Sequence, residues 1–374
     1  MDNRQLYDRY QRQMILKEFG IEGQQKLLSA RVLVIGAGGL GCPVLQYLAG
    51  AGVGNIGIVD DDVVALNNLH RQVMYSVNDI GLSKAETAVR ILQQLNPDIS
   101  ITPFNERLTT KNAFSILNEY EIVIDGTDNF STRYLVNDAC VLLKKPLVYG
   151  AISQFEGQLS IFNVQQNEQE PAVNYRDIFP DPPNEDEVLN CADAGVLGVL
   201  PGIIGAMMAN ETIKLITGMG KPLVNELLTF NTLSNQVFQM KITARKDTRS
   251  LIPKNEPEFI KTDYDWLCSS VASESEIDSD TFNDLLEKGG VDIIDVREPH
   301  ELPEVNEFST IKIPMGMLAE NAGTIKAGTV IAFCQSGKRS VQAGRILSGI
   351  FNGTKKVLSL KGGIVEWKKQ HQIV

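Results

Sequence analysis

Two short loops contain residues that could carry out chemistry. Residues 36–41 read Gly-Ala-Gly-Gly-Leu-Gly and residues 334–339 read Cys-Gln-Ser-Gly-Lys-Arg, each directly after an apolar run. Backbone N–H groups of a glycine-rich loop at the start of a helix bind phosphates. Backbone N–H groups around a cysteine can stabilise a sulfur anion. A chain with both loops is expected to use a nucleotide to activate a group that then receives sulfur.

The glycine loop has the sequence context of a nucleotide site. Gly36, Gly38 and Gly41 match the G-x-G-x-x-G pattern between an expected strand and an expected helix. Asp60 ends the next expected strand, where a ribose-binding acid is typical. By itself this fingerprint also fits an NAD-dependent dehydrogenase, so both nucleotide classes stay open at this point.

Charged residues after the loop favour a triphosphate. A triphosphate carries about twice the charge of a pyrophosphate bridge, so it needs added cations and usually a carboxylate that holds Mg²⁺. Arg71 and Lys84 could neutralise the phosphates, and Asp128 could hold the metal ion. Considered one at a time, each of these residues is more often simply a charged side chain exposed to solvent.

Together these residues resemble the ubiquitin-activating-enzyme-like adenylyltransferases that charge sulfur-carrier proteins in molybdopterin and thiamine biosynthesis. The resemblance covers residues 4–242. It rests on six segments in family order: 9–13, 36–41, 68–71, Lys84, 128–129 and 191–198.

The resemblance implies ATP as nucleotide and roles for individual residues. Asp128 would hold Mg²⁺, and Arg71 would act on the phosphates together with Arg12, which would reach across a homodimer interface. In the implied reaction, the C-terminal carboxylate of a small carrier protein attacks the α-phosphorus of ATP. The implied nucleotide-binding residues are Gly36, Gly38, Gly39, Gly41, Asp60, Asn67, Asn68, Arg71, Lys84, Asp128 and Asn129.

With its surroundings, the cysteine loop resembles the active-site loop of a rhodanese domain, and the resemblance covers residues 278–374. The segments 295–298, 313–316 and 360–367 support the resemblance. It implies a persulfide on Cys334, held by the loop amides and Arg339. A tyrosine phosphatase loop has the similar outline C-x5-R, with one residue more between cysteine and arginine than this chain has.

The other cysteines receive different predictions. Family members that carry a rhodanese domain have a cysteine at the place of Cys191, which implies a covalent relay or a disulfide with Cys334; core packing is the alternative. Cys42 and Cys140 fall on apolar helices and are expected in the core. The three histidines have neither the spacing of metal ligands nor that of a catalytic pair.

A structural zinc is not expected. Relatives hold zinc with two Cys-x-x-Cys pairs, whereas this chain reads Asn-Tyr-Arg-Asp at 174–177 and has no cysteine at 245–250. Tetrahedral thiolate coordination therefore lacks its ligands.

Apolar runs alternate with helical segments between residues 31 and 149, which predicts an α/β fold. The expected architecture is a Rossmann-like nucleotide-binding domain with a mixed, mainly parallel sheet, plus a small α/β rhodanese-like domain. Residues 164–190 are expected to form a long surface loop and 198–217 a buried helix. The predicted domains are 1–242 for adenylyl transfer, 243–277 as linker, and 278–374 for sulfur transfer.

Composition limits the partners and the compartment. The 374 residues are 43% hydrophobic, carry a net charge of −11 and contain no basic tract, which argues against binding nucleic acid or an anionic membrane surface. Five cysteines without regular spacing argue against a disulfide framework and for a reducing cytoplasm.

The sequence therefore predicts a cytoplasmic, homodimeric enzyme that adenylates the C-terminal glycine of a ubiquitin-like sulfur carrier ending in Gly-Gly. A Cys334 persulfide would then form a thiocarboxylate, with a cysteine desulfurase as sulfur donor. Molybdopterin, thiamine and related sulfur pathways stay open. The alternatives are an NAD-dependent oxidoreductase fused to a sulfurtransferase, and a non-catalytic carrier-binding scaffold.

Overall fold

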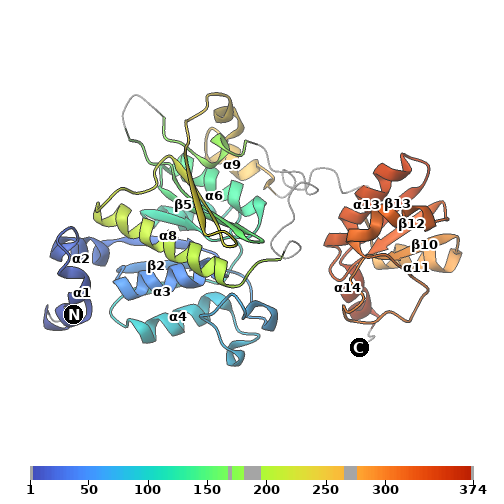
Figure 1. The fold of residues 1–374 in the computed structure, drawn as a ribbon, viewed down its shortest axis with the longest axis horizontal. Helices are drawn as coiled ribbons and strands as arrows, with labels where there is room; N and C mark the ends of the chain where they lie inside the picture. Colours follow the sequence, from blue (N-terminus) through green and yellow to red (C-terminus); the bar gives the residue numbers. More distant parts are fainter. Residues whose placement is uncertain (1–2, 167–170, 181–194, 265–275, 372–374) are drawn as a thin grey trace. The chain divides into compact units, whose positions relative to one another are not determined.

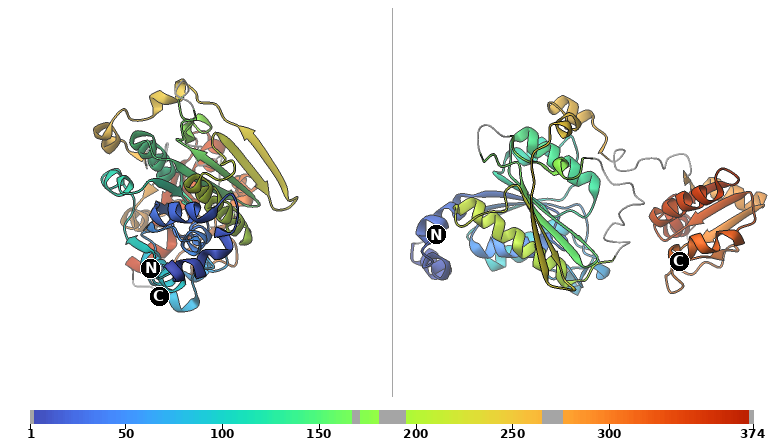
Figure 2. Two further views of the ribbon diagram at one scale, coloured as in Figure 1. Left: turned by 90° about the vertical axis from the view of Figure 1, so that its left-hand side faces the viewer. Right: turned by 45° about the horizontal axis from the view of Figure 1, so that its top comes forward.

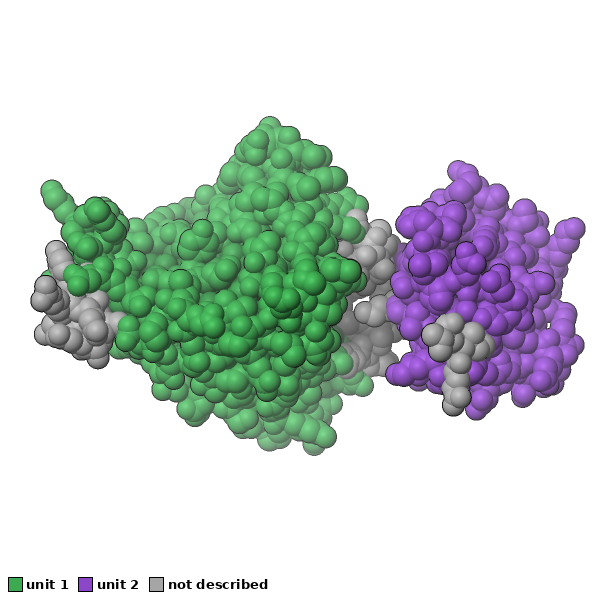
Figure 3. All heavy atoms as spheres, turned by 90° about the horizontal axis from the view of Figure 1, so that it is seen from below, with its two compact units in different colours: residues 1–183, 189–268 green, residues 184–188, 269–374 purple. Residues whose placement is uncertain are grey.

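The chain divides into two compact units, which Figure 3 colours separately. The boundary between them falls at residues 268 and 269, with 184–188 assigned to the second unit. Each unit has its own hydrophobic core. The computed structural model describes residues 3–166, 171–180, 195–264 and 276–371.

Within the described residues, the first unit is built on an eight-stranded sheet in the order β3-β2-β1-β4-β5-β6-β7-β8 (Figure 1). Strands β1 to β5 run parallel, and β6 to β8 are added antiparallel. This confirms the predicted mixed, mainly parallel sheet. The strands are β1 (Arg31–Ile35), β2 (Asn55–Val59), β3 (Ser100–Phe104), β4 (Ile122–Asp125), β5 (Leu147–Ser153), β6 (Glu156–Phe162), β7 (Glu226–Asn231) and β8 (Gln236–Lys241).

Helices cover both faces of this sheet (Figures 1 and 2). One core packs α2, α3, α4 and α8 on one face, and a second core packs α5, α6 and α9 on the other. The helices are α1 (Asn3–Met14), α2 (Gly20–Ser29), α3 (Gly41–Ala51), α4 (Lys84–Leu95), α5 (Ala113–Asn118), α6 (Phe130–Leu143), α8 (Val199–Thr217) and α9 (Glu256–Lys261), with short 3-10 turns at Leu66–Asn68, Val77–Asp79, Tyr175–Asp177 and Asp247–Leu251.

Strand β1 shows why its sequence is apolar throughout. Val32 and Val34 point into the first core, and Leu33 and Ile35 point into the second. Successive side chains of a strand alternate between faces, so a strand covered on both sides is a continuous apolar run. The run then ends where the glycine loop begins.

Helix α8 is the one helix in the described part of the chain that is long and apolar enough to cross a membrane. It packs against α3, β5 and β6. Leu200, Ile204 and Met208 are fully buried, whereas other apolar positions of the helix are half-buried. The expected buried helix is therefore buried along one side.

Two polar segments differ from the sequence-based expectation. Residues 173–177, expected in a surface loop, are buried, and the Tyr175 ring packs against Tyr134 and Phe179. Residues 247–264, expected in the linker, pack onto the first unit through Phe259 and Tyr264. Both segments are held by a few long-range contacts, and such contacts leave no hydrophobic period in the sequence.

The second unit has a five-stranded parallel sheet in the order β11-β10-β12-β13-β9. One core contains residues of α12 and α13, and the other contains Phe282 and Trp367 from α11 and α14. This confirms the predicted second, smaller α/β fold. The elements are β9 (Glu276–Ile277), α11 (Ser279–Lys288), β10 (Val291–Asp295), β11 (Ile311–Lys312), α12 (Leu318–Asn321), β12 (Thr329–Phe333), α13 (Lys338–Phe351), β13 (Lys356–Leu360) and α14 (Gly363–Gln370), with 3-10 turns at Met315–Met317 and Ala322–Thr324.

The packing of α9 gives a stability prediction. Phe259 is 0% exposed, and its ring centroid lies 5.0 Å from that of Phe114. Replacing it with alanine should lower the free energy of unfolding of the first unit by about 3–5 kcal/mol, measured by calorimetry of the full chain. The control is Ile260→Ala on the exposed side of α9, which should change it by less than about 0.5 kcal/mol. Equal, negligible effects of both would show that this segment is a linker after all.

Candidate functional site

The glycine loop lies where the backbones at the ends of β1 and β4 approach closely. Gly36 has φ +91°, and a Cβ there would lie 2.9 Å from the carbonyl oxygen of Gly126. A Cβ on Gly41 would lie 1.9 Å from the carbonyl oxygen of Gly36. Only glycine fits both places, and Gly41 begins α3. At the start of α3 the Cys42 N–H donates to the Gly38 carbonyl and Pro43 has no N–H, so the N–H groups that can face a phosphate are those of loop residues 38–41.

Asp60 ties the end of β2 to this loop. Its Oδ2 accepts a hydrogen bond of 2.7 Å from the backbone N–H of Ala37, and its Oδ1 accepts one of 2.9 Å from Asp62. Burial raises the pKa of Asp60, and the nearby Lys84 ammonium opposes that rise. A carboxylate has about four acceptor positions, so Asp60 can also accept a ribose hydroxyl.

Lys84 is paired within the chain. Its side chain is 5% exposed, and its Nζ lies 2.8 Å from Asp62 Oδ2, whose side chain is 72% exposed. The Lys84 backbone N–H also donates to the Asp62 carbonyl, at the start of α4. The sequence reveals the cation but not this partner, so a phosphate at Lys84 has to compete with Asp62.

The segment that carries Asn67, Asn68 and Arg71 folds over the glycine loop. Arg71 Nη1 donates a 3.1 Å hydrogen bond to the carbonyl of Asn67, and the Asn68 side-chain amide donates to Asn67 Oδ1. A Cβ placed on Gly39 would lie 3.7 Å from Arg71 Cδ. The structure therefore brings Arg71 to the loop, as the resemblance implies.

Sequence reasoning missed Gln72. The side chain is 4% exposed, and a Cβ on Gly38 would lie 3.5 Å from its Nε2. Among the described residues, Gln72 Oε1 has no hydrogen-bond partner. Its position directly after Arg71 was the available signal.

A buried carboxylate ends β4. Asp125 accepts hydrogen bonds from the Thr127 N–H at 2.9 Å and from the Thr127 hydroxyl at 2.6 Å, and it lies 3.7 Å from Arg133 Nε. Burial raises the pKa of Asp125, and Arg133 opposes that rise. The two predicted residues that follow differ in their surroundings: Asp128 is exposed, and Asn129 Oδ1 caps α6 by accepting from Thr132 N at 2.9 Å. Sequence reasoning missed both Asp125 and Arg133.

The structure does not bring Arg12 to this loop. Arg12 is exposed on α1, where its neighbour Arg9 donates to the Leu95 carbonyl. Cys191 lies outside the described residues. Their implied roles stay predictions.

Cys334 lies at the end of β12 and is 1% exposed. Its carbonyl accepts a 2.8 Å hydrogen bond from the N–H of Ile364, at the start of α14. A Cβ on Gly363 would lie 2.5 Å from that carbonyl and from the Gly337 nitrogen, so glycine is required here. Gly337, with φ +90°, then begins α13. The cysteine loop is thus held between the first turns of two helices.

Arg339 is held by a carboxylate. Its Nη1 and Nη2 donate to the two oxygens of Glu301 at 2.6 and 2.5 Å. The hydrogen bond from Arg339 lowers the pKa of Glu301 to about 2. A second fork lies alongside: Arg297 donates to both oxygens of Asp295 at 2.8 and 2.7 Å. Arg339 therefore links the segment around Glu301 to the cysteine loop, a connection that the sequence did not show.

Cys42 and Cys140 are fully buried, as predicted. Burial raises the pKa of Cys42 to about 12 and also raises that of Cys140. Such thiols are poor nucleophiles at neutral pH. With Cys334 they are the free cysteines in the part of the chain that the structure describes.

A carboxylate joins the segments 174–177 and 245–250, the two places where the sequence lacks the cysteine pairs of a zinc site. Asp177 Oδ2 accepts from the N–H and the side-chain amide of Asn174 at 2.8 and 2.9 Å. Asp177 Oδ1 accepts from the Thr248 hydroxyl at 2.6 Å and from the Arg245 N–H at 3.0 Å. Among the described residues, no three His, Cys, Asp or Glu side chains are grouped as metal ligands. The absence of zinc stays a prediction that rests on residue type.

Two protein-family models match the chain, one for each unit. A model of the ThiF family matches residues 10–251, and a model of the rhodanese-like domain matches residues 278–370. The chain belongs to the ThiF family. The first match extends past the predicted start of the linker at 243, in line with the packing of the 3-10 turn Asp247–Leu251 on the first unit.

Three relatives are named as adenylyltransferases, and two of these are also named as sulfurtransferases. The probable adenylyltransferase/sulfurtransferase MoeZ of Mycobacterium tuberculosis is 42% identical over 97% of this chain and 93% of its own length. The sulfur carrier protein adenylyltransferase of Thermus thermophilus is 49% identical over 70% of this chain and 96% of its own. The adenylyltransferase and sulfurtransferase MOCS3 of Culex quinquefasciatus is 40% identical over 96% and 87%. These relatives confirm the predicted family and an enzyme with both activities.

A solved structure shares the fold of this ThiF-family chain. The complex of E. coli MccB with ATP superposes with a TM-score of 0.52 at 21% identity, over 60% of this chain and 68% of that one.

The Arg339–Glu301 pair gives a pH prediction. A Glu pKa that is lowered from an ordinary 4.5 to about 2 stabilises the fold fully above pH 4.5, and this stabilisation is lost as the pH falls through 2. Unfolding of the second unit, followed by calorimetry between pH 2 and 6, should therefore lose part of its pH dependence in Glu301→Gln. Glu304→Gln, on an exposed side chain of the same segment, is the control. Identical pH curves for the wild type and Glu301→Gln would contradict the pairing.

The Asp177 contacts give a second stability prediction. Asp177→Ala removes the acceptor of the Asn174 and Arg245 N–H groups, so it should lower the free energy of unfolding of the first unit by about 2–4 kcal/mol in urea. EDTA should leave the wild-type midpoint unchanged. A lower midpoint with EDTA would instead indicate a structural metal.

Proposed function

We propose that this enzyme adenylates the C-terminal glycine of a small ubiquitin-like sulfur-carrier protein with ATP and then transfers sulfur from a Cys334 persulfide to form a thiocarboxylate. The observation that carries the proposal is that one chain contains both loops. The glycine loop packs tightly against neighbouring backbone in a ThiF-family domain, and the cysteine loop packs between Gly337 and Gly363 in a rhodanese-like domain. The relatives named for both activities support it.

ATP fits the first site by charge and by backbone geometry. The loop residues 38–41 offer backbone N–H groups to the phosphates, Asp60 offers its carboxylate to the ribose, and Arg71 and Lys84 offer cations. Asp128 would hold Mg²⁺ with ATP, because its exposed carboxylate follows Gly126, which contacts the glycine loop. When bound, Mg²⁺ would neutralise phosphate charge.

The adenylation step needs no base. The carrier's C-terminal carboxylate attacks the α-phosphorus, the bond to the bridging oxygen of the β-phosphate breaks, and pyrophosphate leaves. The attacking group and the phosphates are all anions, so the main task of the site is to offset their repulsion. Arg71 and Lys84 do this from one subunit, and in the proposed homodimer Arg12 does so from the partner.

Sulfur transfer follows on the acyl-adenylate. The terminal sulfur of the Cys334 persulfide attacks the acyl carbon, and AMP leaves with its bonding electrons. A thiolate then attacks the Cys334 sulfur and releases the carrier as a thiocarboxylate. With Cys191 as that thiolate, the product is a Cys191–Cys334 disulfide, which an external dithiol reduces. A cysteine desulfurase is the proposed source of the persulfide sulfur.

A homodimer is supported by exposed apolar side chains near Arg12. Ile15, Leu16, Ile21 and Tyr47 are exposed on and between α1, α2 and α3. A second copy would remove this apolar surface from water. The reducing cytoplasm is proposed because both reactive sulfur chemistry and the free thiols require it.

The division of labour between the loops can be tested by pyrophosphate exchange with a Gly-Gly-ended carrier. Cys334→Ser should keep ATP–pyrophosphate exchange and lose thiocarboxylate, followed by mass spectrometry of the carrier. The reciprocal variant Arg71→Ala should lose exchange by about 100-fold and keep sulfur transfer from thiosulfate to cyanide. Loss of both activities in Cys334→Ser would refute the division.

A further inference from the structure

The backbone of Asp62 is fixed beside the glycine loop. Its N–H donates a 2.9 Å hydrogen bond to Asp60 Oδ1, and the other oxygen of Asp60 accepts from the loop itself. Its carbonyl accepts a 2.9 Å hydrogen bond from the Lys84 N–H at the start of α4. The next residue, Val63, forms an antiparallel bridge with Ser83. The backbone therefore sets the position of Asp62 relative to both Asp60 and Lys84.

The two side chains of the Lys84–Asp62 pair differ in their exposure. The Lys84 side chain is 5% exposed and that of Asp62 is 72% exposed, and Nζ lies 2.8 Å from Oδ2. Because the backbone of Asp62 is fixed, rotation of its exposed side chain about the Cα–Cβ bond is enough to open the pair. Lys84 is thus a buried cation that is occupied by an exposed, rotatable carboxylate.

The neighbours of Lys84 indicate which phosphate group it would contact. The Tyr75 hydroxyl donates to the carbonyl of Lys84 at 3.2 Å and to that of Ala37 at 2.9 Å, which ties the start of α4 to the glycine loop. Burial raises the pKa of Asp60 and the Lys84 ammonium opposes that rise, so the ammonium stands near the carboxylate assigned to the ribose. The α-phosphate is attached to the ribose and is therefore the phosphate group nearest to Asp60. It is also the group that remains in the adenylate and in AMP.

We propose that Asp62 is a positioning residue that competes with the α-phosphate for Lys84 and so limits how tightly the enzyme holds AMP. Asp62 acts through Lys84 and takes part in no chemical step. The acyl-adenylate is also held through the attached carrier, whereas AMP, once sulfur transfer has released it, is held through its own groups alone. Asp62 then recaptures Lys84 as AMP leaves. This inference rests on the proposed function, in which AMP is the leaving group of sulfur transfer.

The competition distinguishes a nucleotide from its nucleoside. A ligand that places a phosphate at Lys84 has to break the ion pair with Asp62, and adenosine, which has no phosphate, leaves the pair intact. An ion pair with one exposed partner is modest in strength, so its loss should tighten AMP binding by about fivefold. The affinity for adenosine should stay the same.

The test variant is Asp62→Asn, which keeps the size of the side chain and removes its charge. Lys84 stays close to the Asp60 carboxylate in this variant, so the buried ammonium keeps a counter-charge. The matched control is Asp61→Asn, because the exposed Asp61 carries the same charge at the adjacent position, whereas the ion pair of Lys84 is with Asp62. Both variants change the long-range charge near the site equally.

Isothermal titration calorimetry of the full-length chain measures the binding of AMP and of adenosine. Asp62→Asn should bind AMP about fivefold more tightly than the wild type, and Asp61→Asn should differ from the wild type by less than about twofold. A second comparison uses chains that also carry Lys84→Met. In that background Asp62→Asn should change AMP binding no more than Asp61→Asn does, because the shared partner is gone.

The outcomes separate the hypotheses. Equal tightening by Asp62→Asn and Asp61→Asn shows a general effect of charge and overturns the competition, as does unchanged AMP binding or tighter binding of adenosine. Tighter binding of inorganic pyrophosphate without tighter binding of AMP also overturns it, because Lys84 then holds a different phosphate. If Asp62→Asn does not fold, Asp62→Ser decides by the same criteria. A wild-type chain that binds neither ATP nor AMP refutes the proposed function instead.

Discussion

The close approach of two backbones at the carboxyl ends of β1 and β4 is the constraint on which the nucleotide site depends. A side chain at Gly36 would collide with Gly126, and one at Gly41 would collide with Gly36 itself. Any such side chain would push the loop away from β4 and strain the hydrogen bond between Ala37 and Asp60. The loop, the first turn of α3 and the end of β2 can therefore only move together. The same solution recurs in the second unit, where Gly363 lets α14 approach the cysteine loop.

Carboxylates hold the cations of both sites before any substrate arrives. Lys84 is paired with Asp62, and Arg339 is paired with Glu301. The buried ammonium of Lys84 and the partly buried guanidinium of Arg339 need such partners because desolvation of an unpaired charge is costly. A phosphate that bound at Lys84 would replace the Asp62 carboxylate as its partner, so binding would gain less free energy than an unpaired lysine would give. Sequence motifs identify the cations, but the partners stand 22 and 38 residues away and belong to no motif.

The sequence allowed prediction of the elements whose stability comes from local, periodic burial. Strands β1, β2 and β4 are covered on both faces and read as apolar runs, and α3 and α6 follow at the expected places. Strand β6 was not among the expected apolar runs, because its sequence from Glu156 to Phe162 mixes polar and apolar residues between β5 and β7. The glycine loop could be placed by its pattern alone. Asp125, Arg133 and Gln72 could not, because their importance arises from burial next to the loop rather than from their spacing.

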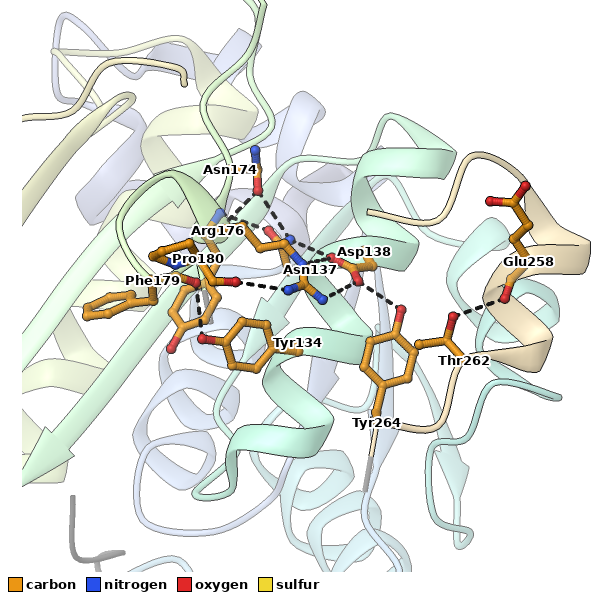
Figure 4. Close-up of polar contacts among 11 residues, drawn as sticks. Tyr134, Asn137, Asp138, Asn174, Arg176, Phe179, Pro180, Glu258, Thr262 and Tyr264 are labelled. Atoms are coloured by element: carbon orange, nitrogen blue, oxygen red, sulfur yellow. Dashed lines mark hydrogen bonds and ion pairs between the residues drawn. The ribbon is translucent and has the colours of Figure 1, made fainter. Parts of the chain in front are cut away.

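The segments at 174–180 and 245–264 pack on the first unit although their sequences have no hydrophobic period, so other contacts must hold them. Asp177 and Asp138 each gather several donors from distant segments, so two buried carboxylates organise backbone that has little apolar surface of its own. A metal ion would do this with four ligands and a fixed geometry. A carboxylate joins the segments through hydrogen bonds instead, and each bond requires its own donor in the right direction. Asp138 accepts from both Arg176 and Tyr264 and so joins the two segments to α6 (Figure 4), which makes their closure over the sheet depend on buried carboxylates rather than on a local sequence pattern.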